Sequence, residues 1–378
     1  MKYSGQDMQT KILQFMKTYG EESIDSSLYE QEFNELALTI FSYQFQHNQA
    51  YKKYCQSKKK TPLLVKHWSD IPPMPIQGFK ELTLSTTPIE EAEAVFMTSG
   101  TTNPASKGKN YHPTLAVWDA SMKTPFQTYV LPDRERMTIF VLSPAEDLNK
   151  NSSLARYLSN AVSFFGTENS RFFFDETGLK MAELAQALKE CEQRKDPVLL
   201  IGATFSYVHL RDYLEKHQLS FQLAEGSRIF DTGGFKGKSR EVEMEEMYQS
   251  FYDFFKIERN HCINMYGMTE LSSQIYDQTI RSHYVTMSTI QDKKGPAWIK
   301  TVVLNTDTLE PAAKGEQGVI AHYDLANWNA CLAILTEDLG CLTENGFILL
   351  GRIQGSEARG CSIAVDELLQ ANTGGAIR

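Results

Sequence analysis

The spacing of apolar residues changes along this chain, and each spacing predicts a different kind of element. In about the first sixty residues, apolar side chains recur at the interval of one helix face, as at Leu28, Phe33, Leu36 and Ile40. The segment Pro72–Pro75 then places three prolines around one methionine, a composition that favours a rigid extended connector. We therefore expect a helical N-terminal segment followed by an extended linker.

Beyond the linker, short β-rich runs alternate with stretches of helical spacing. The expected strands are Met137–Leu142, Arg171–Phe174, Val198–Gly202 and Ser227–Asp231. The expected helices are Ser153–Phe165, Leu179–Glu192 and Tyr207–Lys216. Strands that alternate with helices predict crossover connections and a sheet with parallel character. Ligands of such sheets bind beyond the carboxyl ends of the strands, where the glycine-containing breaks of this sequence fall.

After residue 295 the pattern changes to short strands between Gly, Asn and Glu turns. These strands are expected at Lys300–Leu304, Gly318–Ala321 and Gly346–Leu350. They suit a small antiparallel lobe beside the α/β body. We predict an α/β fold with mixed and parallel sheets flanked by helices. Its three parts are a core with the helical segment over residues 1–295, a β-rich lobe over 296–350 and a short C-terminal tail over 351–378.

Composition narrows the function classes. The chain has 378 residues, 42% of them hydrophobic, which is enough for a large core. A formal charge of -9 and a pI near 5.5 argue against nucleic acid as a partner. No stretch approaches the roughly 20 apolar residues of a membrane span, and the start shows no signal peptide, so we expect a cytoplasmic protein. The six cysteines form no C-x-x-C pair, which gives no support for a zinc site.

The most informative segment follows the apolar run Val95–Met97. It offers hydroxyls and backbone N–H groups from one tight loop, at Thr98, Ser99, Gly100, Thr101 and Thr102. Such arrays bind oxyanions, and a polyphosphate suits them. The Walker spacing is absent. The alternative is an ordinary Ser/Thr-rich surface turn.

Three later segments give this loop its context: Tyr266–Glu270, Thr336–Gly340 and Gly351–Gly355. In order and spacing the four segments resemble the signatures of the adenylate-forming superfamily of acyl- and aryl-CoA ligases, adenylation domains and luciferases. Asp231–Lys236, Tyr266–Gln274 and Gly355–Cys361 resemble more closely the LuxE-type acyl-protein synthetases, which belong with the phenylacetate–CoA ligase-like branch. The resemblance implies ATP-dependent activation of a fatty acid, transfer of the acyl group to Cys361, and delivery to a partner protein.

The resemblance also implies a role for each motif residue. Glu270 would bind Mg²⁺, Thr269 the α-phosphate, and Asp338 the ribose hydroxyls. The remaining nucleotide-binding residues would be the loop Thr98–Thr102, Gly233, Gly234, Tyr266, Gly267 and Arg352. The acceptor of the acyl group would be a reductase or a carrier protein. Two alternatives stay open: an acyl- or aryl-CoA ligase, in which CoA takes the acyl group, and an inactive nucleotide-binding scaffold.

Each role has a plain structural alternative. Glu270 could be a helix N-terminal residue favoured by the dipole, Asp338 could cap a turn, and Tyr266 could be packing. Cys361 follows Arg359 at an expected helix start, where the thiolate is favoured, although free cysteines are often simply buried.

The sequence departs from the superfamily signatures at several positions. Asn103 stands where a second glycine is usual, Glu337 where glycine is usual, and Gln354 where an acidic hinge residue is usual. Only 26 residues follow Arg352, too few for the lid domain with its catalytic lysine. We hypothesise that Lys236 or Lys238 supplies that charge instead.

Overall fold

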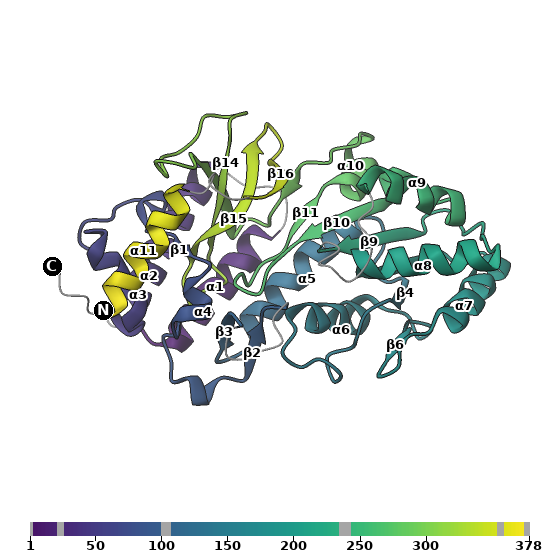
Figure 1. Cartoon of the computed structure of the whole chain (residues 1–378), viewed down its shortest axis with the longest axis horizontal. Helices are drawn as coiled ribbons and strands as arrows, with labels where there is room; N and C mark the ends of the chain where they lie inside the picture. The colour runs from purple at the N-terminus through teal and green to yellow at the C-terminus, as the bar shows by residue number, and fades with distance from the viewer. Residues whose placement is uncertain (1–2, 21–25, 100–106, 234–242, 354–358, 374–378) are drawn as a thin grey trace. The chain divides into compact units, whose positions relative to one another are not determined.

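The computed structural model describes residues 3–20, 26–99, 107–233, 243–353 and 359–373, and these divide into two compact units. The first unit comprises Met1–Ser121, Met268–Gln274 and Asp292–Arg378, and the second comprises Met122–Gly267 and Ile275–Gln291 (Figure 1). The units are discontinuous in sequence, and the boundaries expected at residues 295 and 350 stay predictions.

Helices at the N-terminus cover part of the first unit, as the helical spacing predicted. They are α1 (Gly5–Tyr19), α2 (Ser26–His47) and α3 (Gln49–Ser57). A capping box starts α1, because the Ser4 side chain accepts from the Asp7 N–H while Asp7 accepts from the Ser4 N–H. The linker contributes strand β1 (Met74–Pro75) and the four-residue helix α4 (Gly78–Glu81).

The strands of the first unit form an antiparallel sheet with one parallel addition. The order is β13 (Ile299–Leu304), β14 (Gln317–Asp324), β15 (Ala333–Leu342), β16 (Phe347–Arg352) and β12 (Lys293–Lys294). Strand β1 pairs in parallel with β15, and β2 (Ala94–Met97) forms a separate hairpin with β3 (Lys109–His112). The three late strands expected from sequence are confirmed as β13, β14 and β16. The sequence missed β15, a ten-residue strand that contains the Thr336–Gly340 motif.

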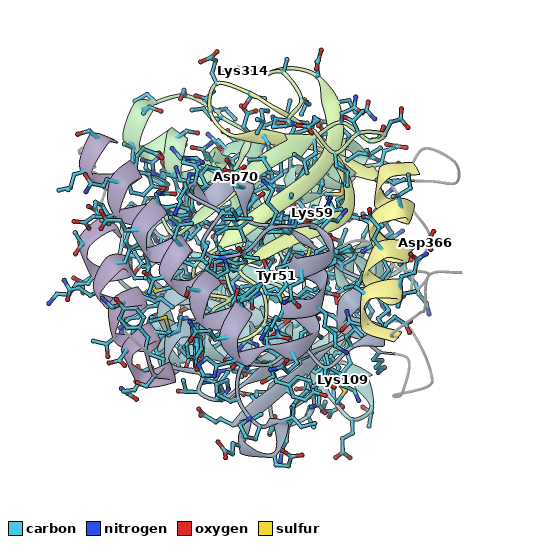
Figure 2. All side chains as sticks on the ribbon, turned by 90° about the vertical axis from the view of Figure 1, so that its left-hand side faces the viewer. Tyr51, Lys59, Asp70, Lys109, Lys314 and Asp366 are labelled. Atoms are coloured by element: carbon cyan, nitrogen blue, oxygen red, sulfur yellow. The ribbon has the colours of Figure 1, made fainter. Side chains whose placement is uncertain are left out.

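Helix α11 (Arg359–Thr373) packs on the first unit beside α3 (Figure 1). Its Ala364 joins a buried cluster with Leu304, Val319, Ala321 and Leu335. Its Gly360 N–H donates to the Thr306 carbonyl at 2.8 Å. Asp366 lies on its exposed side (Figure 2). The helix is therefore held at its start and along one face.

The second unit is the expected α/β layer. Its parallel strands run in the order β10 (Cys262–Tyr266), β9 (Arg228–Thr232), β8 (Val198–Ala203), β4 (Thr138–Val141) and β5 (Arg171–Phe172), and β11 (Ile275–Asp277) is antiparallel to β10. The helices are α5 (Ala116–Val130), which begins in the first unit, α6 (Ser153–Phe165), α7 (Met181–Arg194), α8 (Thr204–His217), α9 (Met244–Phe255) and α10 (Thr279–Thr286). A small hairpin joins β6 (Phe174–Asp175) to β7 (Gly178–Leu179).

The fold class predicted from sequence is confirmed, because all-buried strands such as β8 alternate with amphipathic helices in the second unit. No helix in the described ranges is both long enough and apolar enough to cross a membrane.

Candidate active site

The segment that carries Glu270 is held by a buried polar network in the first unit. The Thr269 carbonyl accepts from Asn110 Nδ2 at 3.0 Å, and the Glu270 carbonyl accepts from Asn327 Nδ2 at 2.9 Å. Farther along the segment, the N–H groups of Ser272 and Ser273 donate to Asp324 Oδ2 at 3.0 and 2.8 Å. A shift of this backbone would break buried hydrogen bonds and leave their groups unsatisfied, which is unfavourable. The network therefore fixes the backbone position of Glu270.

Asp324 is the carboxylate on which this network converges. It is fully buried, and burial raises the pKa of its carboxyl to about 6 although four hydrogen bonds lower it. The donors include the Ser273 hydroxyl, 2.7 Å from Oδ1, and the Ala326 N–H at 3.0 Å. A buried carboxylate needs this many donors to stay ionised near neutral pH. Asp324 thus serves as an acceptor that organises the loop after Glu270.

The Glu270 carboxylate is buried, and its own backbone N–H is a hydrogen-bond donor to it. The residue is 5% exposed, and burial raises the pKa of its carboxyl. No side chain in the described ranges donates a hydrogen bond to it; its charged neighbours are Lys80, Arg352 and Asp338. Glu270 lies in a turn and not at a helix N-terminus, so that alternative is wrong. A buried carboxylate with unused lone pairs is suited to binding a cation.

The hairpin β2–β3 brings Thr98, the first residue of the hydroxyl loop, near this carboxylate. Thr98 closes the hairpin, because its N–H donates to the Gly108 carbonyl and its Oγ1 accepts from the Gly108 N–H, both at 2.9 Å. A Cβ placed on Gly108 would lie 3.1 Å from Thr98 Cγ2 and 3.4 Å from Glu270 Oε1. A larger residue at position 108 would have to displace the Thr98 side chain by a few tenths of an ångström. Thr98 and Glu270 therefore both lie beside Gly108, and the binding roles of both residues stay predictions.

Other loop residues are less fully placed. Ser99 is exposed beside Thr98, and Gly100, Thr101, Thr102 and Asn103 lie outside the described residues. After the loop, Lys107 is half-buried and Lys109 starts β3 (Figure 2). The phosphate-binding role of the loop stays a prediction.

Asp338 and Arg352 are cross-strand neighbours on β15 and β16. Arg352 Nε lies 3.4 Å from Asp338 Oδ1, with side chains 71% and 11% exposed respectively. The Asp338 N–H donates to Thr336 Oγ1 at 3.0 Å. Because Asp338 lies within a strand, the alternative that it caps a turn is wrong. The Asp338 carboxylate and the Arg352 guanidinium instead form an ion pair in the first unit, which also contains Glu270.

The second unit contributes residues at adjacent strand ends. Gly233 directly follows β9 and has φ +74°, a left-handed conformation that favours glycine. Tyr266 ends β10, which pairs in parallel with β9, and is 9% exposed, and Gly267 follows it. These positions match the expected carboxyl edge of a parallel sheet. Gly234, Lys236 and Lys238 lie outside the described residues, so their roles stay hypotheses.

Cys361 lies in the first turn of α11, as expected, although its side chain is outside what the structure describes. Among the other cysteines, burial raises the pKa of the Cys55, Cys191, Cys262 and Cys331 thiols. A thiol with a raised pKa is a poor nucleophile at neutral pH.

The sequence reasoning missed the residues that support the site. Asn110, Asn327 and Asp324 act through buried hydrogen bonds, which leave no periodic signal in a sequence. Lys80, a charged neighbour of Glu270, also went unnoticed. The only feature of the sequence that marks Lys80 is its position shortly after the proline-rich linker.

Comparison with known proteins gives the family and the fold of the chain. A family model described as "Acyl-protein synthetase, LuxE" matches residues 21–370. A long-chain-fatty-acid–luciferin-component ligase from Aliivibrio fischeri is 22% identical over 90% of this chain and 89% of its own length, and one from Vibrio harveyi is 21% identical over 92% of each. A crystal structure of 2-hydroxyisobutyryl-CoA ligase in complex with 2-HIB-AMP superposes with a TM-score of 0.63 at 13% identity. That match covers 85% of this chain and 68% of the ligase, and it shows the shared fold.

The family match extends over nearly the whole chain, and it includes every signature segment that suggested the resemblance. The predictions of an acyl-adenylate-forming enzyme and of the acyl-protein synthetase type are thereby confirmed. The chain belongs to the LuxE family of acyl-protein synthetases.

Proposed function

We propose that this chain activates a long-chain fatty acid with ATP, takes the acyl group onto Cys361, and passes it to a partner protein. The observation that carries the proposal is the convergence of Thr98 and Glu270 around Gly108. The names of the two curated relatives support a long-chain fatty acid as the substrate. The cytoplasmic location expected from sequence stays a prediction.

The residues fit ATP with a divalent cation. Glu270 is a buried carboxylate with no side-chain donor in the described ranges, and carboxylate oxygen is the ligand type that Mg²⁺ prefers. When bound, Mg²⁺ would neutralise charge on the phosphates. In the proposed site, the backbone and hydroxyls of Ser99–Thr102 hold the β- and γ-phosphates, Thr269 holds the α-phosphate and Asp338 the ribose. The resemblance also assigns nucleotide binding to Gly233, Gly234, Tyr266 and Gly267. Arg352 holds Asp338 in place.

The proposed reaction has two steps. In the first, a carboxylate oxygen of the fatty acid attacks the α-phosphorus. The bond to the bridging oxygen breaks, and pyrophosphate leaves with the electron pair. In the second, the Cys361 thiolate attacks the acyl carbonyl and AMP leaves, which forms a thioester. A helix start favours thiolate, and Cys361 lies in the first turn of α11.

The test is covalent labelling with radiolabelled fatty acid and ATP. We expect a label on the protein that hydroxylamine removes, and that Cys361→Ala abolishes. Cys341→Ala is the matched control, because Cys341 is half-buried on β15 and should leave the label unchanged.

Two outcomes would favour the alternatives. Turnover that requires CoA and ignores Cys361→Ala would indicate a CoA ligase. Absence of both label and fatty-acid-dependent pyrophosphate exchange would indicate an inactive scaffold. Because a serine hydroxyl could itself accept the acyl group, retention of the label in Cys361→Ala would remove Cys361 from the mechanism. A reductase or carrier as final acceptor is tested by transfer of the label to the added protein.

A further inference from the structure

Lys80 lies at the site although no signature segment contains it. A Cβ placed on Gly108 would be 3.5 Å from Lys80 Cγ, beside the contacts already described to Thr98 and Glu270. Three side chains thus surround one glycine. The Lys80 ammonium extends beyond Cγ on a flexible stem, and it is among the charges that act on Glu270.

The helix that carries Lys80 is held firmly. Strand β1 pairs with β15, and the next residue, Ile76, donates its N–H to the Leu335 carbonyl at 3.0 Å. The Gln77 side chain donates to Glu337 Oε1, one residue before Asp338. A Cβ on Gly78 would lie 2.6 Å from Met74 Sδ and 3.2 Å from Leu368 Cδ2 of α11. These contacts fix the backbone from which Lys80 projects.

The charges around Glu270 are not equivalent. Arg352 is already paired with Asp338 across the strands. Lys80 is exposed and forms no ion pair with any residue in the described ranges, although a buried carboxylate is its neighbour. A lysine in that position has its charge available for a third group. Lysine acts on phosphate as a point charge.

We propose that Lys80 is a further catalytic residue, whose ammonium contacts the α-phosphate as the fatty-acid carboxylate attacks it. This inference rests on the proposed function. The attack brings two anions together, so a fixed cation at the reacting phosphate stabilises the transition state. Lys80 stays protonated throughout. The electron pair leaves with pyrophosphate, and no proton transfer is needed.

The test compares Lys80→Met with wild type in fatty-acid-dependent pyrophosphate exchange over a range of Mg²⁺ concentrations. Methionine keeps the apolar stem and removes the charge. We expect exchange to fall about one-hundred- to one-thousand-fold at every Mg²⁺ concentration, with the thermal melt unchanged. Lys80→Arg, which retains a charge, should keep part of the rate. Lys53→Met, on an exposed part of α3, is the control and should exchange like wild type.

The outcomes separate this inference from the proposed function. If wild type shows no fatty-acid-dependent exchange, the proposed function fails and this inference fails with it. If wild type exchanges and Lys80→Met matches it, only the inference fails. A deficit that disappears at saturating Mg²⁺ would also overturn it, because Lys80 would then act only as a counter-ion of Glu270. Calorimetric titration with ATP gives a second readout, and weaker binding by Lys80→Met is the supporting result.

Discussion

Asn327 links the stability of this protein to its proposed metal site. Its side chain is almost completely buried, and Nδ2 donates to the Glu270 carbonyl at 2.9 Å and to the Cys331 carbonyl at 2.7 Å. Its Oδ1 accepts from the Ser272 hydroxyl at 3.1 Å. Asn327→Ala therefore leaves three buried groups without their partner, two of them in the segment that carries the proposed metal ligand.

The loss of stability expected for Asn327→Ala follows from these hydrogen bonds. A net contribution near 1 kcal/mol for each hydrogen bond, with more where a buried group stays unsatisfied, predicts a loss of about 3–5 kcal/mol in the free energy of unfolding. Folded proteins have about 5–15 kcal/mol in total, so the variant should fold but with reduced stability. Groups that orient a metal ligand typically affect metal affinity about 10–100-fold. We therefore expect the Mg²⁺ concentration for half-maximal pyrophosphate exchange to rise about tenfold or more.

Asn329 provides the matched control. It is similarly buried, and its Nδ2 donates to Ser85 Oγ at 3.1 Å and to the Tyr111 carbonyl at 2.8 Å, while Oδ1 accepts from Thr86 Oγ1 at 2.6 Å. None of these partners lies in the Glu270 segment. Denaturant unfolding should show a loss of stability in both alanine variants, and only Asn327→Ala should change the Mg²⁺ dependence. Equal Mg²⁺ dependence in the two variants would refute the reasoning.

Three further predictions concern the pH dependence of stability, the room for a side chain at position 108, and the KM for ATP. Burial lowers the pKa of His322 from 6.5 to about 3, so its neutral form stabilises the fold fully above pH 6.5 and that stability is lost as pH falls. Denaturant unfolding should lose about 2 kcal/mol from this group between pH 7 and pH 5, and His322→Gln should flatten that drop. Gly108→Ala puts a methyl group against Thr98 and Glu270. Pyrophosphate exchange should therefore fall, and the free energy of unfolding should drop by about 1–3 kcal/mol. Exchange at the wild-type rate would contradict the close approach of these side chains. Asp338→Asn should raise KM for ATP and leave KM for the fatty acid unchanged, whereas equal effects on both would remove Asp338 from the nucleotide site.

Sequence pattern predicted part of the second unit. Continuous apolar runs with helical spacing between them gave strands β4, β5, β8 and β9 and helices α6, α7 and α8, whereas β10, β11, α5, α9 and α10 were not predicted. Strand β15 was missed because Glu337 and Asp338 interrupt an apolar run and resemble a turn. The structure shows Asp338 buried within that strand and next to Arg352.

The supporting residues could not have been found in the same way. Lys80 is a charged neighbour of Glu270 through the fold alone, because β1 pairs with β15, more than 250 residues later in the chain. Asn327 is one buried asparagine among several, and only its partners distinguish it. By contrast, the resemblance assigned Thr98 and Glu270 to one nucleotide site, and in the structure both side chains lie beside Gly108.

The most direct test of this account is exchange of radiolabelled pyrophosphate into ATP, measured with a long-chain fatty acid in wild type and Glu270→Gln. We predict exchange in wild type that requires both the fatty acid and Mg²⁺, and a fall of about one-hundred-fold or more in a Glu270→Gln protein that melts like wild type. Wild type that shows no fatty-acid-dependent exchange, or Glu270→Gln that exchanges at the wild-type rate, would contradict the account.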